Sequence, residues 1–379
     1  MTDAERPRRP RHLAVLTAGG DCPGMNAALR AVVRAAVHRH GMRVTGFLDG
    51  FAGLLADQPR ALGFDEVSGI LALGGTILGA SNRDDPFRVP VDRSGTRAYE
   101  DHSHAVLATV ARHGIDGLVV IGGDGSLTIA RRLAARGLAV VVIPKTIDND
   151  VPGTDVSLGF DSALGIATDA LDRLHTTAAS HHRVMVVEVM GRQAGWIALE
   201  AGLAAGGDVI LIPEIAFRYD AVAAGILARA RRGRRFSIVV IAEGARGPDG
   251  SAVVRQVIED SPEPRRLGGV GMVVAHALEA RVPFEVRYVV LGHVQRGGSP
   301  TPFDRMLATR FGTAAVATLA AGDSGVMVAL RGERIERVPL AAIPSEPRRV
   351  DPCGERVMAA RDIGTIFGDE SLPGAPVPR

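Results

Sequence analysis

The stretch Leu118-Val119-Val120-Ile121-Gly122-Gly123-Asp124-Gly125-Ser126, residues 118–126, predicts a buried strand that runs directly into a helix. Four consecutive apolar residues without polar alternation are typical of a parallel strand covered by helices on both faces. Apolar runs of the same kind recur along the chain, at residues 13–16, 140–143, 184–189, 238–241 and 286–291. Helical patterns alternate with them, as at residues 26–38, 127–136 and 163–176. This alternation predicts an α/β fold with mainly parallel sheets.

The length and composition of the chain indicate two domains. Its 379 residues exceed the size at which a single hydrophobic core stops growing. Hydrophobic residues make up 46% of the sequence and aromatic residues only 4%, which suits an aliphatic α/β protein. We therefore expect two Rossmann-like lobes, with ligand-binding loops at the carboxyl ends of their strands.

The charge balance and the cysteine content bound the class of protein. The formal net charge is +2, so no nucleic-acid partner is expected. Cys22 and Cys353 are too few for a disulfide framework, which indicates a reducing compartment and favours the cytoplasm. No apolar stretch approaches the ~20 residues that a membrane span needs, so no membrane partner is expected either.

One strand-end loop, residues 144–150 or Pro-Lys-Thr-Ile-Asp-Asn-Asp, contains the only lysine of the chain, Lys145. We call it the lysine loop. Because every other strongly basic side chain is arginine, a single ammonium indicates a site that needs a compact point charge, although one lysine can also survive by chance. Asp148 and Asp150 lie on one face if the loop is extended. One carboxylate can then act as a base while the other serves a metal ion.

The glycine loops favour phosphate binding. Gly122 and Gly123 let backbone N–H groups approach a phosphate at the positive end of the next helix. Asp124 adds a hard oxygen ligand for Mg²⁺, while plain turn chemistry with Ser126 as the N-cap is the alternative. The first glycine loop, residues 19–24, lacks the G-x-G-x-x-G spacing, and no P-loop motif occurs, which disfavours a dehydrogenase or a P-loop protein.

The chain also offers the cations that phosphoryl transfer requires. A carboxylate must lie near the attacking hydroxyl group, and positive charge must surround the transferred phosphate. Lys145, Arg83 and Arg192 can supply that charge. The candidate arginine forks for a phosphorylated acceptor are Arg183, Arg287 and Arg296, with His293 beside the last. The alternative for each is an ordinary surface side chain.

Five motifs resemble those of the 6-phosphofructokinase family in order and spacing, over almost the whole chain from Leu13 to about Leu330. They are Leu16–Asn26, Ile121–Ser126, Lys145–Asp150, Val187–Arg192 and Leu291–Pro300. The resemblance implies a phosphotransferase that moves the γ-phosphate of ATP, bound with Mg²⁺, to the 1-hydroxyl group of D-fructose 6-phosphate. Its product would be fructose 1,6-bisphosphate, made in glycolysis.

The resemblance also implies a role for each site residue. Asp148 would take the proton from the 1-hydroxyl group and Thr146 would position the transferred phosphate, with Asp150 and Arg192 completing the catalytic group. Asp124 would hold Mg²⁺. The nucleotide site would be formed by Gly19, Arg83, Asp84, Gly122, Gly123, Asp124, Gly125, Ser126 and Lys145. The sugar would be held by Thr146, Asp148, Met190, Gly191, Arg192 and Glu243, and its 6-phosphate by Arg183, Arg287, His293 and Arg296.

Two lobes and an oligomer follow from the same resemblance. The larger, nucleotide-binding lobe would comprise residues 1–159 and 295–345, and the smaller, sugar-phosphate-binding lobe residues 160–294 and 346–379, with the active site in the cleft between them. In this family some phosphate-binding arginines come from a neighbouring subunit. A homo-oligomer, either a tetramer or a dimer, is therefore implied, with Arg183 and Arg287 contributed to the neighbouring active site.

Two residues disagree about the phosphoryl donor. In the family, glycine at the position of Gly125 leaves room for ATP, whereas pyrophosphate-using members commonly carry aspartate there. Lys145 is typical of pyrophosphate users, although a mixed-substrate subgroup of ATP users also has this combination. We expect ATP, because steric exclusion forbids a nucleotide whereas an added ammonium only adds attraction. Pyrophosphate is the alternative donor.

A third reading is a non-catalytic regulatory subunit that binds a sugar phosphate. It predicts a damaged catalytic loop, whereas Asp124, Thr146, Asp148 and Asp150 are all intact. Regulation of an active enzyme is left open. Arg30 and Arg34 match effector-site positions of the bacterial enzymes, but His175 stands where those enzymes have arginine.

Overall fold

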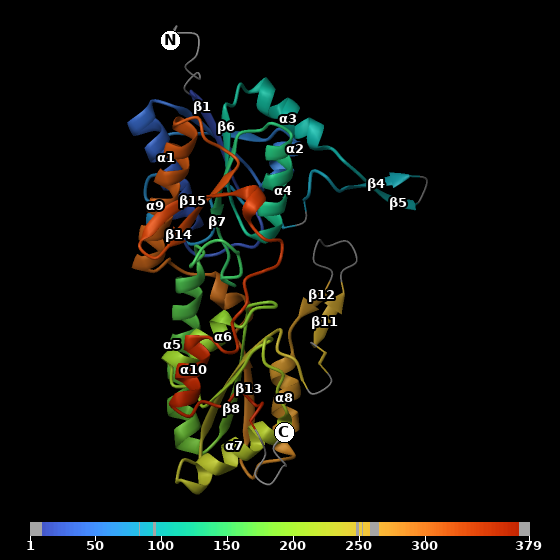
Figure 1. Cartoon of the computed structure of the whole chain (residues 1–379), viewed down its shortest axis with the longest axis vertical. Helices are drawn as coiled ribbons and strands as arrows, with labels where there is room; N and C mark the ends of the chain where they lie inside the picture. The colour runs from blue at the N-terminus through green and yellow to red at the C-terminus, as the bar shows by residue number, and fades with distance from the viewer. Residues whose placement is uncertain are drawn as a thin grey trace. The chain divides into compact units, whose positions relative to one another are not determined.

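The computed structural model describes residues 10–82, 84–93, 96–247, 250–251, 253–257 and 265–370. The chain divides into two compact units (Figure 1). Unit 1 comprises Met1–Ile147, Val151–Asp161 and Arg296–Pro347, and unit 2 comprises Asp148–Asp150, Ser162–Gln295 and Arg348–Arg379. The division runs through the lysine loop, since Lys145, Thr146 and Ile147 belong to unit 1 while residues 148–150 belong to unit 2.

Unit 1 is built on a seven-stranded sheet with the order β15-β14-β7-β6-β1-β2-β3. Its strands are β1 (His12–Thr17), β2 (Arg43–Phe47), β3 (Pro59–Leu62), β6 (Gly117–Gly122), β7 (Val140–Pro144), β14 (Val326–Arg331) and β15 (Arg334–Pro339). The five central strands are parallel, and β3 and β15 pair antiparallel at the two edges. The predicted α/β fold with a mainly parallel sheet is confirmed.

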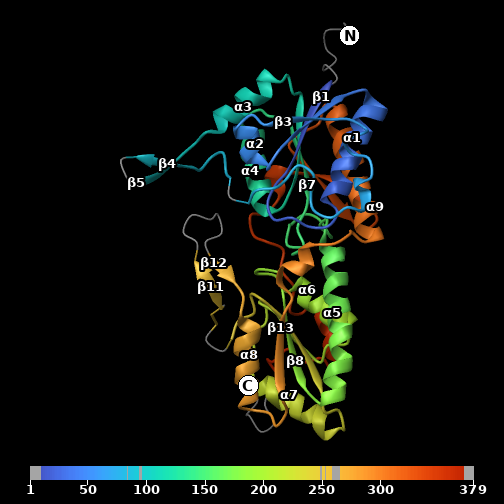
Figure 2. The same ribbon diagram turned by 180° about the vertical axis from the view of Figure 1, so that it is seen from behind.

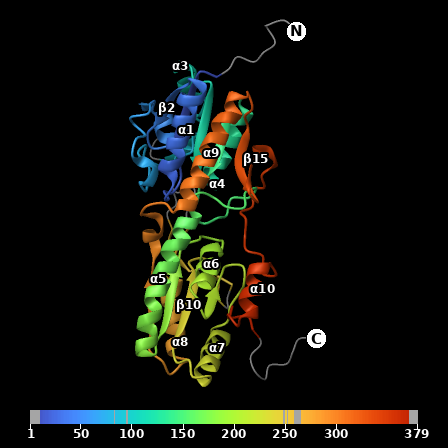
Figure 3. The ribbon, with the colours of Figure 1, turned by 90° about the vertical axis from the view of Figure 1, so that its left-hand side faces the viewer.

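Helices cover both faces of this sheet, because alternate side chains of a strand point to opposite faces. Leu13 and Val15 of β1 pack in one core with α1 (Met25–His40) and α9 (Pro302–Ala320). Leu16 packs in a second core with α2 (Phe51–Leu55), α3 (Ser103–Arg112) and α4 (Asp124–Ala135). Helices α1 and α9 lie side by side (Figure 3). Gly312 of α9 permits this approach, since a Cβ there would lie 2.6 Å from the Cβ of Ala31.

Unit 2 contains a four-stranded parallel sheet with the order β13-β8-β10-β9. Its strands are β8 (Val184–Val189), β9 (Val209–Leu211), β10 (Ser237–Ala242) and β13 (Val286–Val290). The helices in this part of the chain are α5 (Phe160–His181), α6 (Trp196–Ala204), α7 (Tyr219–Arg231), α8 (Val270–Glu279) and α10 (Glu355–Asp362), seen from behind in Figure 2. Strands β8 and β10 are buried along their whole length, as predicted.

The expectation of full burial is wrong for the apolar run at 286–291. Tyr288 and Val290 of β13 are 44% and 49% exposed. In the sheet that the described residues form, strand β13 lies at the edge and pairs with β8. Its side chains are therefore less covered than those of the central strands.

The sequence patterns did not predict two antiparallel strand pairs that the described residues form. One pair is β4 (Val89–Arg93) with β5 (Thr96–Glu100), and the other is β11 (Val254–Val257) with β12 (Arg265–Leu267). The first projects from the rest of unit 1 (Figure 1). The described ranges also contain the short 3₁₀ helices η2 (Ile70–Ala72), η3 (Gly292–Arg296) and η4 (Leu340–Ala342). Among the described residues, every helix is too short or too polar to span a bilayer.

Candidate functional site

Three strand-end loops of unit 1 meet at the carboxyl edge of its sheet. A Cβ on Gly19, after β1, would lie 3.3 Å from Nζ of Lys145, after β7, and 3.7 Å from Oγ of Ser126, after β6. A Cβ on Gly122 would lie only 2.5 Å from the same Oγ, so glycine is required for this packing. A Cβ on Gly123 would lie 3.1 Å from the carbonyl oxygen of Lys145. The structure therefore brings together the residues predicted from these three loops.

Two cationic side chains lie against the first glycine loop. Lys145 is only 2% exposed, and its Nζ donates a hydrogen bond to the Gly20 carbonyl oxygen at 2.5 Å. Arg296 donates from Nη1 to the Asp21 carbonyl oxygen at 2.9 Å. A Cβ on Gly20 would lie 2.9 Å from that same Nη1. Both contacts fall within unit 1, so Arg296, which the sequence analysis assigns to the sugar phosphate, packs on the glycine loop.

The amino end of α4 presents backbone donors to this site. Gly123 is its N-cap residue and no side chain caps it, so the N-cap alternative for Ser126 is wrong. The N–H groups of a first helical turn have no partner within the helix, and the helix dipole makes this end positive. A Cβ on Gly125 would meet no side-chain atom of the described residues within 4 Å. The helix end is therefore open to an anion at Gly125.

A cavity of about 350 Å³ adjoins these loops, lined by Gly19, Gly20, Asp21, Gly75, Thr76, Ala80 and Asn82. Another glycine loop, residues 74–82, is held there by Gly19, whose N–H donates to the Ser81 carbonyl oxygen at 2.9 Å. Ser81 Oγ in turn donates to Asp84. Thr17 also holds this loop, by donating from Oγ1 to the Gly79 carbonyl oxygen at 2.7 Å. Arg83 lies outside the described residues.

Asn26 is a functional candidate that the sequence reasoning missed. Its Nδ2 donates to the carbonyl oxygens of Leu73 and Gly74 at 3.2 and 3.0 Å. Its Oδ1 accepts from the Ile77 N–H at 2.8 Å. The available signal was an amide side chain shortly after the first glycine loop, at the start of a segment rich in alanine and valine. Asn26 thus fixes the loop that lines the cavity.

The chemistry of the donors fits Mg²⁺ that arrives with a nucleotide. Among the described residues, no group of three or more histidine, cysteine or acidic side chains could hold a metal ion by itself. Asp124 is half-buried in the first turn of α4, beside the open helix end. Mg²⁺ is commonly bound through one or two carboxylates together with substrate phosphates and water. Asp124 meets that requirement once phosphate oxygens are present.

In unit 2, Asp148 lies near the loop after β8. Asp148 is 2% exposed, and its Oδ2 is 4.0 Å from Nε of Arg192. Arg192 has a φ of 53°, a conformation fixed by the hydrogen bond that its N–H donates to Oε1 of Glu243 at 3.0 Å. The Glu243 N–H donates to the Val189 carbonyl oxygen at 2.9 Å. The predicted residues Asp148, Arg192 and Glu243 therefore come together, with Met190 and Gly191 on the same loop.

The remaining residues of the lysine loop are held by backbone contacts. The Thr146 N–H donates to the Leu158 carbonyl oxygen at 3.1 Å, and its own carbonyl oxygen accepts from Ser157 Oγ at 2.8 Å. Its side chain is half-buried. Asp150 is 7% exposed, and its carbonyl oxygen accepts from the Arg348 N–H at 2.7 Å.

Glu188 is a second residue that the sequence reasoning missed. It is 2% exposed in β8 and accepts hydrogen bonds from the N–H groups of Gly269, at 3.0 and 3.1 Å, and Gly271, at 2.7 Å. These groups lie at the amino end of α8, where a carboxylate is favourable. A single carboxylate inside an apolar strand was the available signal. Glu188 ties α8 to the strand that precedes Arg192.

Within unit 2, Arg183 and Arg287 lie apart from the loop after β8 that carries Arg192. Arg183 precedes β8 and Arg287 is the second residue of β13, so both lie at the amino ends of these strands. A six-residue strand such as β8 spans ~20 Å. Both arginines pair with Glu285, and the hydrogen bond from Arg183 lowers the pKa of that carboxyl. His293, by contrast, is exposed in η3 after the carboxyl end of β13.

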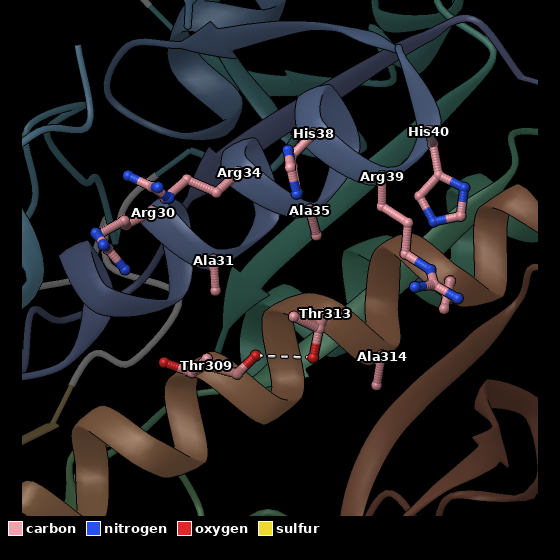
Figure 4. A pocket seen from close by; sticks show the side chains of 11 residues that line it. Arg30, Ala31, Arg34, Ala35, His38, Arg39, His40, Thr309, Thr313 and Ala314 are labelled. Carbon is pink, nitrogen blue, oxygen red and sulfur yellow. Dashed lines mark hydrogen bonds between the residues drawn. The ribbon is translucent and has the colours of Figure 1, made fainter. Parts of the chain in front are cut away.

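A second cavity in unit 1, of about 660 Å³, lies between α1 and α9 (Figure 4). Its basic side chains are Arg30, Arg34, His38, Arg39 and His40. Within the described part of the chain, none of them forms an ion pair with a carboxylate. Alanines of both helices form its apolar floor, at positions 31, 35, 314 and 317.

Comparison with known proteins shows one family. A family model described as phosphofructokinase matches residues 12–319. An ATP-dependent 6-phosphofructokinase of Chloroflexus aurantiacus is 50% identical over 363 residues, covering 96% of this chain and 99% of the relative. A pyrophosphate–fructose 6-phosphate 1-phosphotransferase of Streptomyces coelicolor is 49% identical over 357 residues, covering 94% and 99%. The structure of phosphofructokinase from Saccharomyces cerevisiae matches with a TM-score of 0.73 at 34% identity, covering 87% of this chain and 45% of that one.

Proposed function

The chain belongs to the phosphofructokinase family, and from that premise we propose that it transfers the γ-phosphate of ATP to the 1-hydroxyl group of D-fructose 6-phosphate. The product is fructose 1,6-bisphosphate, and the reaction is a step of glycolysis. The observation that carries the proposal is the convergence of three strand-end loops on one phosphate-binding edge, where Gly19, Ser126 and Lys145 meet.

Unit 1 supplies the donor side of this reaction. The open amino end of α4 and the glycine loops provide backbone N–H donors for phosphate oxygens, and Lys145 adds positive charge. Asp124 would hold Mg²⁺ together with oxygens of the nucleotide. When bound, the metal ion neutralises charge that develops on the transferred phosphoryl group.

Unit 2 supplies the acceptor side. Asp148 is the proposed general base for the 1-hydroxyl group, since a carboxylate in hydrogen-bond reach of that proton is what the reaction needs. Arg192, with Nε 4.0 Å from the carboxylate, is proposed to stabilise negative charge on the transferred group. Thr146 is proposed to position that group, Asp150 to complete the catalytic group, and Met190, Gly191, Arg192 and Glu243 to hold the sugar. That the active site lies in a cleft remains a prediction.

The surroundings of Gly125 and Lys145 support ATP as the donor. A Cβ on Gly125 would meet no described side chain within 4 Å, so none of the described side chains blocks a nucleotide at this position. Lys145 already donates to the Gly20 carbonyl oxygen, which gives the lysine a role in either enzyme type. The name of the Streptomyces coelicolor relative specifies pyrophosphate as its donor, and this similarity supports pyrophosphate as the alternative donor. A regulatory subunit without catalysis is disfavoured, because every residue proposed for catalysis is present.

The test compares the two donors directly. Purified protein is incubated with Mg²⁺, fructose 6-phosphate and either ATP or pyrophosphate at matched concentrations, and fructose 1,6-bisphosphate is measured. Product with ATP, and much less with pyrophosphate, is the expected result. Faster reaction with pyrophosphate would overturn the choice of donor, and no product with either would overturn the proposed reaction.

The positions of Arg183 and Arg287 support a homo-oligomer, a dimer or a tetramer. Both are proposed to bind the sugar 6-phosphate, yet within one chain they lie at the strand ends opposite to Arg192. We propose that they serve the active site of a neighbouring subunit, while His293 and Arg296 serve their own. A cytoplasmic location and effector binding at Arg30 and Arg34 stay predictions.

A further inference from the structure

The segment that begins at Arg348 fastens residues 148–150 to unit 2. These three residues belong to unit 2 although the chain on both sides of them belongs to unit 1. Arg348 is distant from these three residues in the sequence, and it lies outside the five family motifs. We infer that Arg348 is a positioning residue for Asp148, acting through the backbone of Asn149 and Asp150. The inference rests on the proposed function, because it assumes that Asp148 is the base.

Two hydrogen bonds from Arg348 reach this loop. Its backbone N–H donates to the carbonyl oxygen of Asp150 at 2.7 Å, and its Nε donates to the carbonyl oxygen of Asn149 at 3.2 Å. Asn149 is 3% exposed and has a φ of 53°, in the left-handed region that asparagine adopts more readily than most residues. Arg348 thus fixes the backbone directly after Asp148, and with it the direction in which that side chain leaves the chain.

The guanidinium group of Arg348 is itself held by Trp196, the only tryptophan of the sequence. It lies over the Trp196 ring, with Cζ 4.3 Å from the ring centroid. Trp196 Nε1 donates to the Arg348 carbonyl oxygen at 3.1 Å. Trp196 is 7% exposed at the start of α6, so it is a rigid support. A cation over an indole face is favourable, which holds the guanidinium in one place.

A half-buried carboxylate, that of Glu214, anchors the same segment. Oε1 of Glu214 accepts from the N–H groups of Gly195 and Val350, both at 3.0 Å. Burial raises the pKa of the Glu214 carboxyl. The residue before Trp196 and the residue two positions after Arg348 are therefore tied to one group. This bracing leaves Arg348 little freedom to move away from the loop.

A positioning role makes a prediction that a merely structural role does not. Misplacing a catalytic group by about 1 Å costs on the order of 10²-fold in rate while substrate binding is largely kept. Replacing Arg348 by methionine keeps the length of the side chain and the backbone N–H, but removes the Nε donor and the charge. We expect R348M to lower kcat by about 10- to 100-fold, with both KM values within about twofold of the wild type. R348K, which keeps the charge, should restore part of kcat.

The matched control is R356M. Arg356 also lies near the Trp196 ring, at 5.7 Å, but its ion pair is with Glu200 and it makes no described contact with residues 148–150. It should leave kcat and both KM values unchanged. A further readout needs no catalysis. In R348M, but not in R356M, amide hydrogen exchange of residues 146–151 should accelerate, because Arg348 donates hydrogen bonds to this loop.

These experiments distinguish failure of the proposed reaction from failure of the positioning role of Arg348. If the wild-type protein makes no fructose 1,6-bisphosphate, the proposed function fails, while hydrogen exchange in R348M still decides whether Arg348 fixes the loop. If the wild type is active and R348M keeps its kcat, the positioning role is wrong. The role is also wrong if the loss of kcat vanishes once rates are normalised to the folded fraction measured by circular dichroism.

Discussion

The ammonium group of Lys145 donates a hydrogen bond to the carbonyl oxygen of Gly20, with an Nζ–O distance of 2.5 Å. The two residues follow β7 and β1, which are separated in the sheet by β6. The bond therefore links two loops across the carboxyl edge of three strands. The only lysine of the chain thus both places positive charge at the proposed donor site and fixes the loop that lines it.

Replacing Lys145 by methionine tests this double role. A partly buried carbonyl group loses a charged partner, so we expect the free energy of unfolding to fall by about 1–3 kcal/mol. The KM for ATP should rise severalfold, while the KM for fructose 6-phosphate stays near its original value. Denaturant titration and steady-state kinetics measure these quantities. Unchanged stability together with an unchanged KM for ATP would contradict the assignment.

Replacing Gly125 by aspartate should exclude ATP without harming the fold. The new side chain enters open space, so the free energy of unfolding should change by no more than about 0.5 kcal/mol. Its carboxylate would stand at the positive end of α4, where it repels phosphates and occupies their place. We expect the KM for ATP to rise by more than about tenfold. Thr128, exposed on the same helix, gives the control T128D, which should bind ATP normally.

Replacing Asp148 by asparagine removes the proposed base and keeps the size of the side chain. Turnover should fall by roughly 10²–10⁴, while fructose 6-phosphate still binds, as measured by calorimetry. D172N, the same change at an exposed position of α5, should be as active as the wild type. Near-normal turnover of D148N would remove Asp148 from the role of base.

Mixing two inactive variants tests whether Arg287 serves a neighbouring subunit. Oligomers of D148N alone lack the base, and oligomers of R287A alone lack the phosphate-binding arginine. In mixed oligomers, an Asp148 from one chain can meet an Arg287 from the other, so part of the activity should return after co-refolding. If Arg287 acts in its own chain, the mixture gains nothing over the separate variants.

The two cysteines should differ sharply in reactivity. Burial raises the pKa of the Cys22 thiol to about 12, whereas Cys353 is exposed. Because the thiolate is the reactive form, Cys22 stays protonated and unreactive at pH 8. Iodoacetamide should therefore modify Cys353 alone in the native protein, as seen by mass spectrometry. The variant C353S should then take up no label until it is unfolded, and labelling of native Cys22 would contradict its burial.

Local patterns were enough to predict most of the strands, the covering helices and the parallel sheets. A run such as residues 184–189 predicts a buried strand, because a strand that is covered on both faces is apolar at nearly every position. The glycine loops likewise predicted phosphate binding, because glycine lets the backbone approach a phosphate closely. The order and spacing of the motifs then indicated the family, since each motif is a contiguous stretch of sequence.

By itself, then, the sequence determined the fold class, the family and the residue types of the site, all of which are encoded by neighbouring residues. Tertiary structure alone decided which partners those residues have. Lys145 and Gly20 are 125 positions apart, and Arg348 and Asn149 are 199 apart. The exposure of β13 and the separation of Arg183 from Arg192 are also properties of sheet order and strand direction. Such contacts arise from how strands pack side by side, and no periodicity within one segment records them.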